Sequence, residues 1–272
     1  MSSSPRRAII IAAGRGRRLV PYTDEMPKCM VPVGDDQSPI ARIQLDALRA
    51  HGVDDVVFIR GYLGDVLEAR QSELGGAVRF VDNREWEHNN ILESLFCASG
   101  ELEGSVILSY SDIIFTPAVV EALMASPGET CLVIDREFRS IYEGRTEHPL
   151  DEAEVCTVNA EGHVATVGKR SSPAESAWGE FIGLAKLSAA SVKQFVELWR
   201  ELQAQYAGRT GEPFQRAPSF RQAYLTDLLQ ELIGRGSVVT PVAIEGQWRE
   251  IDTVQDLQRA RALLSSNKEQ WT

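Results

Sequence analysis

The first half of the chain alternates short apolar runs with segments whose apolar residues recur at helical spacing. The apolar runs predict buried strands at residues 8–12, 56–59, 78–81, 106–108 and 131–134. The periodic segments predict helices at 39–50, 62–74, 91–98 and 117–125. An apolar strand, a helix and a second apolar strand are typical of parallel βαβ units with both sheet faces covered. The pattern therefore predicts an α/β fold with a Rossmann-like, mostly parallel central sheet and helices on both faces.

The pattern changes after Asp135. A hairpin is predicted at 154–159 and 163–169, with further strands at 181–187 and 238–244. Helices are predicted at 188–206, 220–233 and 253–264, and a glycine- and proline-rich loop at 208–218. We expect a single domain over 1–264 with halves at 1–135 and 136–264, the second containing a small β-rich part, and a frayed tail at 265–272.

Composition narrows the class of protein. Of the 272 residues, 43% are hydrophobic and 25% are charged, as in folded proteins. The net charge of −11 argues against a nucleic-acid partner, which requires a basic surface. No apolar run approaches the ~20 residues of a membrane span, so no membrane contact is expected. The cysteines form no CxxC pair, which favours free thiols in a reducing cytoplasm.

A glycine-rich loop follows the first predicted strand. It has the sequence Ala12-Ala13-Gly14-Arg15-Gly16-Arg17-Arg18-Leu19, and Pro27-Lys28 follows. A glycine-rich turn after a buried strand can direct backbone N–H groups at an anion, and arginine and lysine add phosphate donors. A dinucleotide fingerprint is disfavoured by Leu19 at its third glycine and by Pro21, and the G-K-[ST] of a Walker loop is absent. A plain turn with solvated arginines is the remaining alternative.

The loop and Pro27-Lys28 resemble the signature of nucleotidyltransferases that make nucleoside-diphospho sugars and alcohols. Shorter matches through most of the chain resemble the branch of phosphocholine and phosphonate cytidylyltransferases: Asn89-Asn90-x-x-x-Ser94-Leu95, Ser109-Tyr110-Ser111-Asp112-Ile113-Ile114-Phe115, Glu180-Phe181-Ile182-Gly183 and Glu250-Ile251-Asp252. The resemblance implies an enzyme that transfers CMP from CTP to a small acceptor and releases pyrophosphate. The acceptor would be an aminoalkyl or hydroxyalkyl phosphonate or phosphocholine, with a phosphonate favoured by the segment from Ser109 to Phe115.

The resemblance also assigns roles to residues of the predicted nucleotide-binding half. Lys28 and Arg18 are the expected catalytic residues. The expected nucleotide-binding residues are Ala12, Ala13, Gly14, Arg15, Gly16, Arg18, Asn89, Asn90, Ser94 and Asp112. Amides and a hydroxyl at a helix start can contact the edge of a pyrimidine, although helix capping by Asn90 explains that residue equally well.

Mg²⁺ is the expected cofactor. Asp112 follows a buried strand, and ligands of open parallel sheets bind at the carboxyl ends of strands. Mg²⁺ uses one or two carboxylates together with phosphate oxygens and water. The resemblance pairs Asp112 with Asp252 as metal ligands. The alternatives are a turn cap for Asp112 and the N-cap of the last helix for Asp252.

The second half is expected to bind the acceptor. By resemblance, Lys169 would hold its phosphorus group, and Glu180, Asp227 and Glu250 would hold a cationic amine. Three aromatic residues, Trp178, Trp248 and Tyr142, offer faces for a cation. Solvated acids and core aromatic residues are the alternatives. The four histidines, His51, His88, His148 and His163, have no metal or triad spacing and are expected to be structural.

Three other functions remain open at this stage. A sugar-1-phosphate nucleotidyltransferase would have little use for the acids of the second half. An NAD(P)-binding oxidoreductase is disfavoured by Leu19 and Pro21. A non-catalytic nucleotide sensor would not need Lys28, Asp112 and Asp252 together. CTP and a small phosphorus-containing acceptor are the expected partners, and a homo-oligomer is left open.

Overall fold

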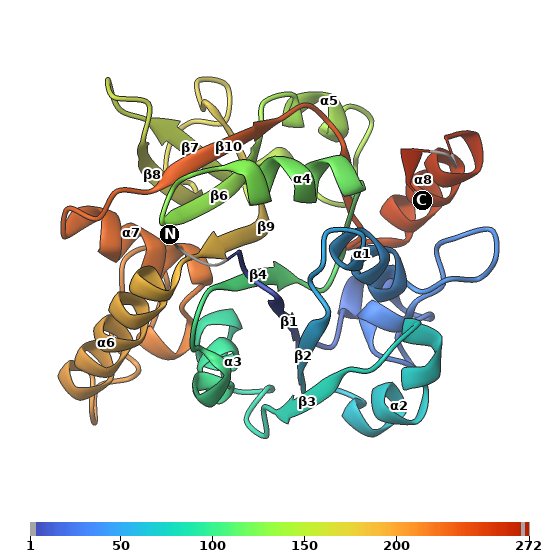
Figure 1. Cartoon of the computed structure of the whole chain (residues 1–272), viewed down its shortest axis with the longest axis horizontal. Helices are drawn as coiled ribbons and strands as arrows, with labels where there is room; N and C mark the ends of the chain where they lie inside the picture. Colours follow the sequence, from blue (N-terminus) through green and yellow to red (C-terminus); the bar gives the residue numbers. More distant parts are fainter. Residues whose placement is uncertain (1–3, 268–269, 272) are drawn as a thin grey trace.

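The computed structural model describes residues 4–267 and 270–271 (Figure 1). Within these residues, nine strands form the main sheet: β1 (Arg7–Ala12), β2 (Asp55–Arg60), β3 (Arg79–Asp82), β4 (Val106–Tyr110), β6 (Thr130–Asp135), β7 (Glu154–Val158), β8 (Val164–Lys169), β9 (Gly179–Leu187) and β10 (Thr240–Ile244). A separate pair consists of β5 (Ile113–Phe115) and β11 (Trp248–Glu250).

Eight α-helices lie in the described part of the chain: α1 (Ile40–Arg49), α2 (Gly64–Ala69), α3 (Ile91–Cys97), α4 (Pro117–Ala125), α5 (Phe138–Tyr142), α6 (Ala189–Gln205), α7 (Leu225–Gly234) and α8 (Val254–Ser266). Short 3-10 turns also occur, at η1 (Arg17–Leu19), η2 (Lys28–Met30), η3 (Gln71–Leu74), η4 (Ser99–Glu101), η5 (Leu150–Glu152) and η6 (Phe220–Gln222). None of the described helices is both long and apolar enough to cross a membrane.

The main sheet is mostly parallel. Its strand order is β10-β6-β9-β4-β1-β2-β3, and β7 pairs with β8 and β9. Strand β1 is parallel to both β2 and β4, while β9 runs antiparallel between β4 and β6. The predicted α/β class with a mostly parallel central sheet is confirmed. Because β9 comes from the second half of the sequence and lies between two strands of the first, both halves contribute to one sheet.

Helices cover both faces of this sheet, as predicted. Ile9 and Ile11 of β1 belong to the core packed with α3, α6 and α7. Ala8 and Ile10 belong to the opposite core, packed with α1 and α4 (Figure 1). Since successive side chains of a strand point to opposite faces, burial on both faces explains why the predicted strands are continuously apolar.

A third, smaller core joins the beginning of the chain to its end. Leu19 and Val31 belong to the segment between β1 and α1. They pack with Ile114 of β5 and with Leu257 and Leu264 of α8. This packing fixes the glycine-rich loop against the C-terminal helix.

Several elements differ from the prediction. Strands β5 and β11 and helix α5 were not predicted, and the helix predicted over 220–233 is η6 followed by α7. The tail predicted to be frayed from Ser265 begins inside α8, and Trp271 is 7% exposed. Trp271 packs in the third core. Residues 268, 269 and 272 of that tail lie outside the described residues.

The strand order also locates a crevice. From β1 the chain proceeds to β2 on one side, and β4 lies on the other side. In open α/β sheets such a reversal separates the loops at the carboxyl ends of the two strands and leaves room for a ligand. Here those loops are the glycine-rich segment after β1 and the turn at Asp112 after β4.

Candidate active site

The glycine-rich loop folds back onto Lys28. Gly16 has φ +65°, and a Cβ at this position would lie 3.0 Å from the Cβ of Lys28. The carbonyl of Gly16 accepts hydrogen bonds from Leu19 N and Thr23 Oγ1, each at 3.0 Å. Position 16 therefore requires glycine, both for its backbone conformation and for the close approach of the lysine.

Lys28 is buried between two carboxylates. Its Nζ donates to Asp112 Oδ2 at 2.8 Å and to Asp252 Oδ1 at 2.6 Å. Burial alone would lower the pKa of Lys28, but the charges of Asp112 and Asp252 outweigh it and raise this pKa well above its usual value. For Asp252, burial is outweighed by the Lys28 charge and a His148 hydrogen bond, so its pKa lies well below the usual range. We therefore expect Lys28 and Asp252 to be charged at neutral pH.

The pairing of β5 with β11 brings the two aspartates together. Glu250 pairs with Ile113 in this antiparallel pair, and Ile251 N donates to Asp112 O at 2.8 Å. Thr253, not Asp252, is the N-cap of α8, because its side chain accepts from the N–H of Asp256. The Asp252 carboxylate therefore accepts a hydrogen bond from Lys28 and does not cap the helix.

Gln44 supports the turn that carries Asp112. It is fully buried on α1 and donates from Nε2 to Tyr110 O at 2.8 Å and Ile113 O at 2.5 Å. Our sequence analysis missed this residue. The available signal is a polar residue on the apolar face of the predicted helix, four positions after Ile40 and four before Leu48.

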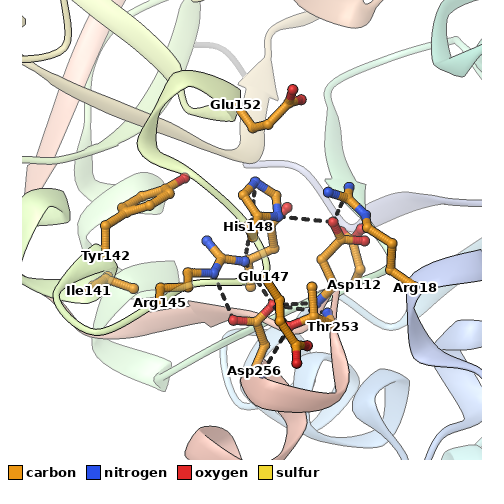
Figure 2. Close-up of polar contacts among 12 residues, drawn as sticks. Arg18, Asp112, Ile141, Tyr142, Arg145, Glu147, His148, Glu152, Thr253 and Asp256 are labelled. Atoms are coloured by element: carbon orange, nitrogen blue, oxygen red, sulfur yellow. Dashed lines mark hydrogen bonds and ion pairs between the residues drawn. The ribbon is translucent and has the colours of Figure 1, made fainter.

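His148 also lies in the site, which differs from the expected structural role. Its Nδ1 is 3.0 Å from Asp252 Oδ2, and its Nε2 is 3.7 Å from Glu250 Oε2. Arg18 contacts the same Asp252 carboxylate from the other side. Figure 2 shows His148 and Arg18 approaching one carboxylate from the segment before η5 and from the glycine-rich loop.

Arg145 ties the segment 143–149 to the start of α8 (Figure 2). Its Nε lies 2.7 Å from Asp256 Oδ1, and its Nη2 lies 2.8 Å from Glu250 Oε2. The guanidinium also lies over the ring of Tyr142, 4.9 Å from the centroid. The side chain of Arg145 is only 2% exposed, so it connects Glu250 to the protein interior. No sequence pattern indicated this residue.

Two cavities share Arg18, Asp112 and Asp252 in their linings, and Lys28, which contacts both aspartates, lines the larger one. The larger has a volume of about 370 Å³ and is lined by Ile11, Ala13, Gly14, Gly16, Arg17, Arg18, Lys28, Trp86, Asn89, Asn90, Ile91, Ser94, Tyr110, Ser111, Asp112 and Asp252. Most of the predicted nucleotide-binding residues are in this set. Ala12 is buried in β1 and Arg15 lies over the ring of Tyr62, so these two fall outside the cavity lining.

A buried amide holds the polar groups at the start of α3. Asn83, which the sequence analysis missed, is 1% exposed and donates to Asn89 Oδ1 at 2.9 Å and Ser94 Oγ at 2.7 Å. Asn90 caps α3 by accepting from Ile91 N at 2.9 Å. Asn90 therefore caps the helix and also lines the cavity.

The smaller cavity has a volume of about 140 Å³ and is rich in acids. Its lining consists of Arg18, Ile91, Tyr110, Asp112, Ile113, His148, Glu152, Glu154, Lys169, Glu180, Phe181, Ile182, Tyr224, Trp248, Glu250 and Asp252. Lys169, Glu180 and Glu250 lie where the sequence predicted a second binding pocket. Asp227 does not line it: its carboxylate accepts from the backbone N–H groups of Tyr224 and Arg216 and caps α7.

Burial raises the pKa values of several acids of this cavity. It raises the pKa of Glu154 to about 7, although Lys169 and hydrogen bonds from Tyr110 and Thr226 oppose the shift. Burial and the neighbouring Glu250 raise the pKa of Glu180 well above its usual value. The pocket therefore holds carboxyl groups that become more acidic when a cation enters.

The carboxylates of the site also fit a hard divalent cation. Asp112 and Asp252 both reach Lys28, and donor atoms of His148, Glu250 and Asp252 lie within 4.8 Å of one another. Carboxylate oxygens suit Mg²⁺, whereas imidazole suits softer transition metals. The donor chemistry of Asp112 and Asp252 is thus compatible with Mg²⁺, while His148 fits better as a hydrogen-bond partner of Asp252.

A glycine- and arginine-rich loop lines one cavity, and the adjacent Lys28 contacts the two aspartates that this cavity shares with a second; this arrangement suits an enzyme that joins a nucleotide to another anion. The fold and the site thus define a nucleotidyltransferase. A family model described as the MobA-like NTP transferase domain matches residues 8–267, and the chain belongs to this family.

Several relatives of the chain are cytidylyltransferases, which confirms the predicted resemblance. The chain is 28% identical over 257 residues to CTP:phosphoglutamine cytidylyltransferase of Campylobacter jejuni, covering 92% of this chain and 97% of that protein. It is 34% identical over 109 residues to choline-phosphate cytidylyltransferase of Streptococcus pneumoniae, covering 40% of this chain and 46% of that protein.

The fold also matches solved structures. The inositol-1-phosphate CTP transferase of T. maritima superimposes with a TM-score of 0.75 at 21% identity, covering 99% of this chain and 98% of that chain. At this identity the match supports the fold, and the site must be argued from its own residues.

Proposed function

We propose that this protein is a Mg²⁺-dependent cytidylyltransferase that transfers CMP from CTP to a small phosphonate or phospho-alcohol and releases pyrophosphate. The observation that carries the proposal is the Lys28 ammonium of the larger cavity, held by Asp112 and Asp252, which line both cavities. Attack of an acceptor oxygen on the α-phosphorus brings two anions together. A fixed cation between them reduces their repulsion and stabilises the charge that develops on phosphorus.

The larger cavity would bind the nucleotide. Backbone N–H groups of the Gly14–Gly16 turn and the Arg18 guanidinium would hold the β- and γ-phosphates. Asn89 and Ser94, both fixed by Asn83, offer donors and acceptors for a pyrimidine edge. The relatives that use CTP support cytosine as the base.

Asp112 and Asp252 would hold Mg²⁺, which supplies positive charge to the phosphate oxygens when bound. Neighbouring side chains hold these two aspartates in place. Gln44 fixes the Asp112 turn. His148 and Arg18 orient the Asp252 carboxylate.

The smaller cavity would bind the acceptor, because it shares Arg18, Asp112 and Asp252 with the larger one. Lys169, 2.8 Å from Glu152, is the cation available for the phosphorus group. Glu180 and Glu250 favour a positively charged group at the far end of the acceptor, whereas a neutral sugar would place no positive charge beside these acids. The four free cysteines are consistent with a reducing cytoplasm, where we propose that the enzyme works.

The test measures pyrophosphate release with each of the four NTPs against a panel of phosphonates, phosphocholine and sugar phosphates. We expect release with CTP and a cationic phosphonate or phospho-alcohol, dependent on added Mg²⁺. Absence of release with CTP and every phosphorus acceptor would contradict the proposal.

A substitution at Asp112 tests the metal assignment. Asp112→Asn should lower Mg²⁺-dependent turnover by about 100-fold or more, because it removes one anionic ligand and one partner of Lys28. The exposed Asp54→Asn is the matched control and should turn over like the wild type. Normal turnover of a folded Asp112→Asn protein would remove Asp112 from the metal site.

A further inference from the structure

Glu180 has hydrogen-bonding capacity that the protein leaves unused. The residue is 4% exposed on β9, and its Oε1 accepts a hydrogen bond from Tyr142 OH at 2.8 Å. Its other oxygen, Oε2, is buried and has no hydrogen-bond partner among the described residues. A buried carboxylate oxygen without a donor is costly. A ligand that donates an N–H to this oxygen would remove that cost.

The other acids that line only the smaller cavity already have partners. Glu152 lies 2.8 Å from Lys169, and Glu250 lies 2.8 Å from Arg145. Both oxygens of Glu154 accept hydrogen bonds, from Tyr110 at 3.0 Å and Thr226 at 3.2 Å. Among the described acids that line only this cavity, Glu180 therefore has a buried carboxylate oxygen without a partner, and Glu250 adds negative charge beside it.

Two aromatic rings near the cavity are covered by cations of the protein itself, and two that line it, Tyr110 and Phe181, pack edge to face against each other with centroids 6.0 Å apart. Arg145 lies over the ring of Tyr142 at 4.9 Å, and Lys169 over that of Tyr224 at 5.0 Å. Trp178 is stacked with Arg136 at 4.1 Å and does not line the cavity. Trp248 is 3% exposed and donates its Nε1 to Asp135. A trimethylammonium group has no N–H and is recognised by open aromatic faces, so this pocket offers it little.

We infer that, within the proposed cytidylyl transfer, the smaller cavity selects an acceptor with a protonated primary amine over one with a trimethylammonium group. The inference rests on the proposed function. The ammonium donates one N–H to Glu180 Oε2 and lies beside Glu250. Methylation of the nitrogen removes the donor and leaves the carboxylate oxygen unsatisfied, while a hydroxyl in place of the amine removes the charge.

The test compares acceptors that differ only in this head group. Pyrophosphate release is measured with CTP and either 2-aminoethylphosphonate, its N,N,N-trimethyl derivative or 2-hydroxyethylphosphonate. We expect kcat/KM for the primary amine to exceed each of the other two by about tenfold or more. An equal or higher value for the trimethyl compound overturns the inference and leaves the proposed function standing. Failure of all acceptors, including the wider panel above, overturns both.

Glu180→Gln tests whether Glu180 is responsible for the selection of a primary amine. In this variant, the ratio of kcat/KM for the primary amine to kcat/KM for the trimethyl compound should fall about tenfold. KM for CTP should stay within about twofold of the wild-type value. Glu180→Asp should recover part of the preference, and Glu197→Gln, an exposed change on α6, should retain all of it. Thermal melting checks that each variant is folded. A folded Glu180→Gln enzyme with the wild-type preference overturns the inference, and the acceptor comparison on the wild type tests it if this variant does not fold.

Discussion

At the scale of single residues, Gly16 and Lys28 depend on each other. The left-handed backbone at Gly16 turns the loop, and the absence of a Cβ lets the lysine pass close to it. A side chain at this position would strain the backbone and displace the ammonium that joins the two aspartates.

We therefore expect Gly16→Ala to lower the free energy of unfolding by about 1–2 kcal/mol, the cost of a left-handed conformation for an L-residue. KM for CTP should rise, because the loop backbone would no longer be held against Lys28. Urea unfolding and initial-rate measurements check both effects. The control is Gly211→Ala, since that glycine has no neighbour within 4 Å and no positive φ. Equal effects of the two substitutions would contradict this account.

Glu154 predicts a pH dependence of stability. Its pKa is about 7 in the folded protein, against a usual value of 4.5. The folded state therefore holds a proton that the unfolded state releases, so this contribution to stability is fully present below pH 4.5 and is lost as the pH rises through 7. At about 1.4 kcal/mol for each pKa unit, the loss is about 3 kcal/mol.

Glu154→Gln checks this prediction, because glutamine resembles the protonated carboxyl group. Urea unfolding is measured for both proteins at pH 4.5 and pH 8. The wild type should lose about 3 kcal/mol more than the variant over this interval. Parallel losses would show that Glu154 does not titrate in this range.

The residues of the site that could be predicted are those carried by short local patterns. Lys28 follows the glycine-rich loop, Asp112 follows a buried strand, and Asp252 precedes a helix. In the structure, the charged atoms of the three residues lie together. His148 and Arg145 lie in an irregular segment with no periodicity. Their importance comes from contacts with Asp252 and Asp256, which are distant in the sequence, so no local pattern could reveal it.

At the scale of elements, long and continuous apolar strands were predicted and very short ones were not. β5 and β11 have three residues each, too few for a periodicity to be visible. They nevertheless align Asp112 with Asp252. The helix predicted at 220–233 also begins later, because the Asp227 side chain accepts from Tyr224 N and starts α7 there.

One buried ion pair, between Arg145 and Asp256, joins the segment 143–149 to α8, beside hydrogen bonds between the segment and Gln255. We expect Arg145→Met to lower the free energy of unfolding by about 3–5 kcal/mol, because it leaves Asp256 buried without its partner. Arg235→Met removes an arginine that is 39% exposed and contacts two glutamates, and it should cost about 1 kcal/mol or less. Chemical denaturation of the two variants makes the comparison. Similar losses would mean that Arg145 is not the anchor of this segment.

At the scale of the whole molecule, the net charge of −11 is an average over an uneven distribution of charge. Cations gather around the glycine-rich loop and at Lys28, while acids line the smaller cavity. The average over the chain argues against a polyanionic partner such as nucleic acid, yet it is compatible with one nucleotide bound beside one cation. The common border of the cavities follows from the sheet order, which no count of residues could predict.

The common border has a consequence for the reaction product. In the proposed reaction, the nucleotide joined to its acceptor would occupy both cavities at once, as a bivalent ligand does. After one end dissociates, the other keeps it nearby at a high effective concentration, so it rebinds before it escapes. Departure of the product is then slower than departure of either substrate, and we expect this exit to limit the rate of turnover. Pyrophosphate formed in the first turnover should accordingly appear as a burst, with an amplitude equal to the concentration of active enzyme.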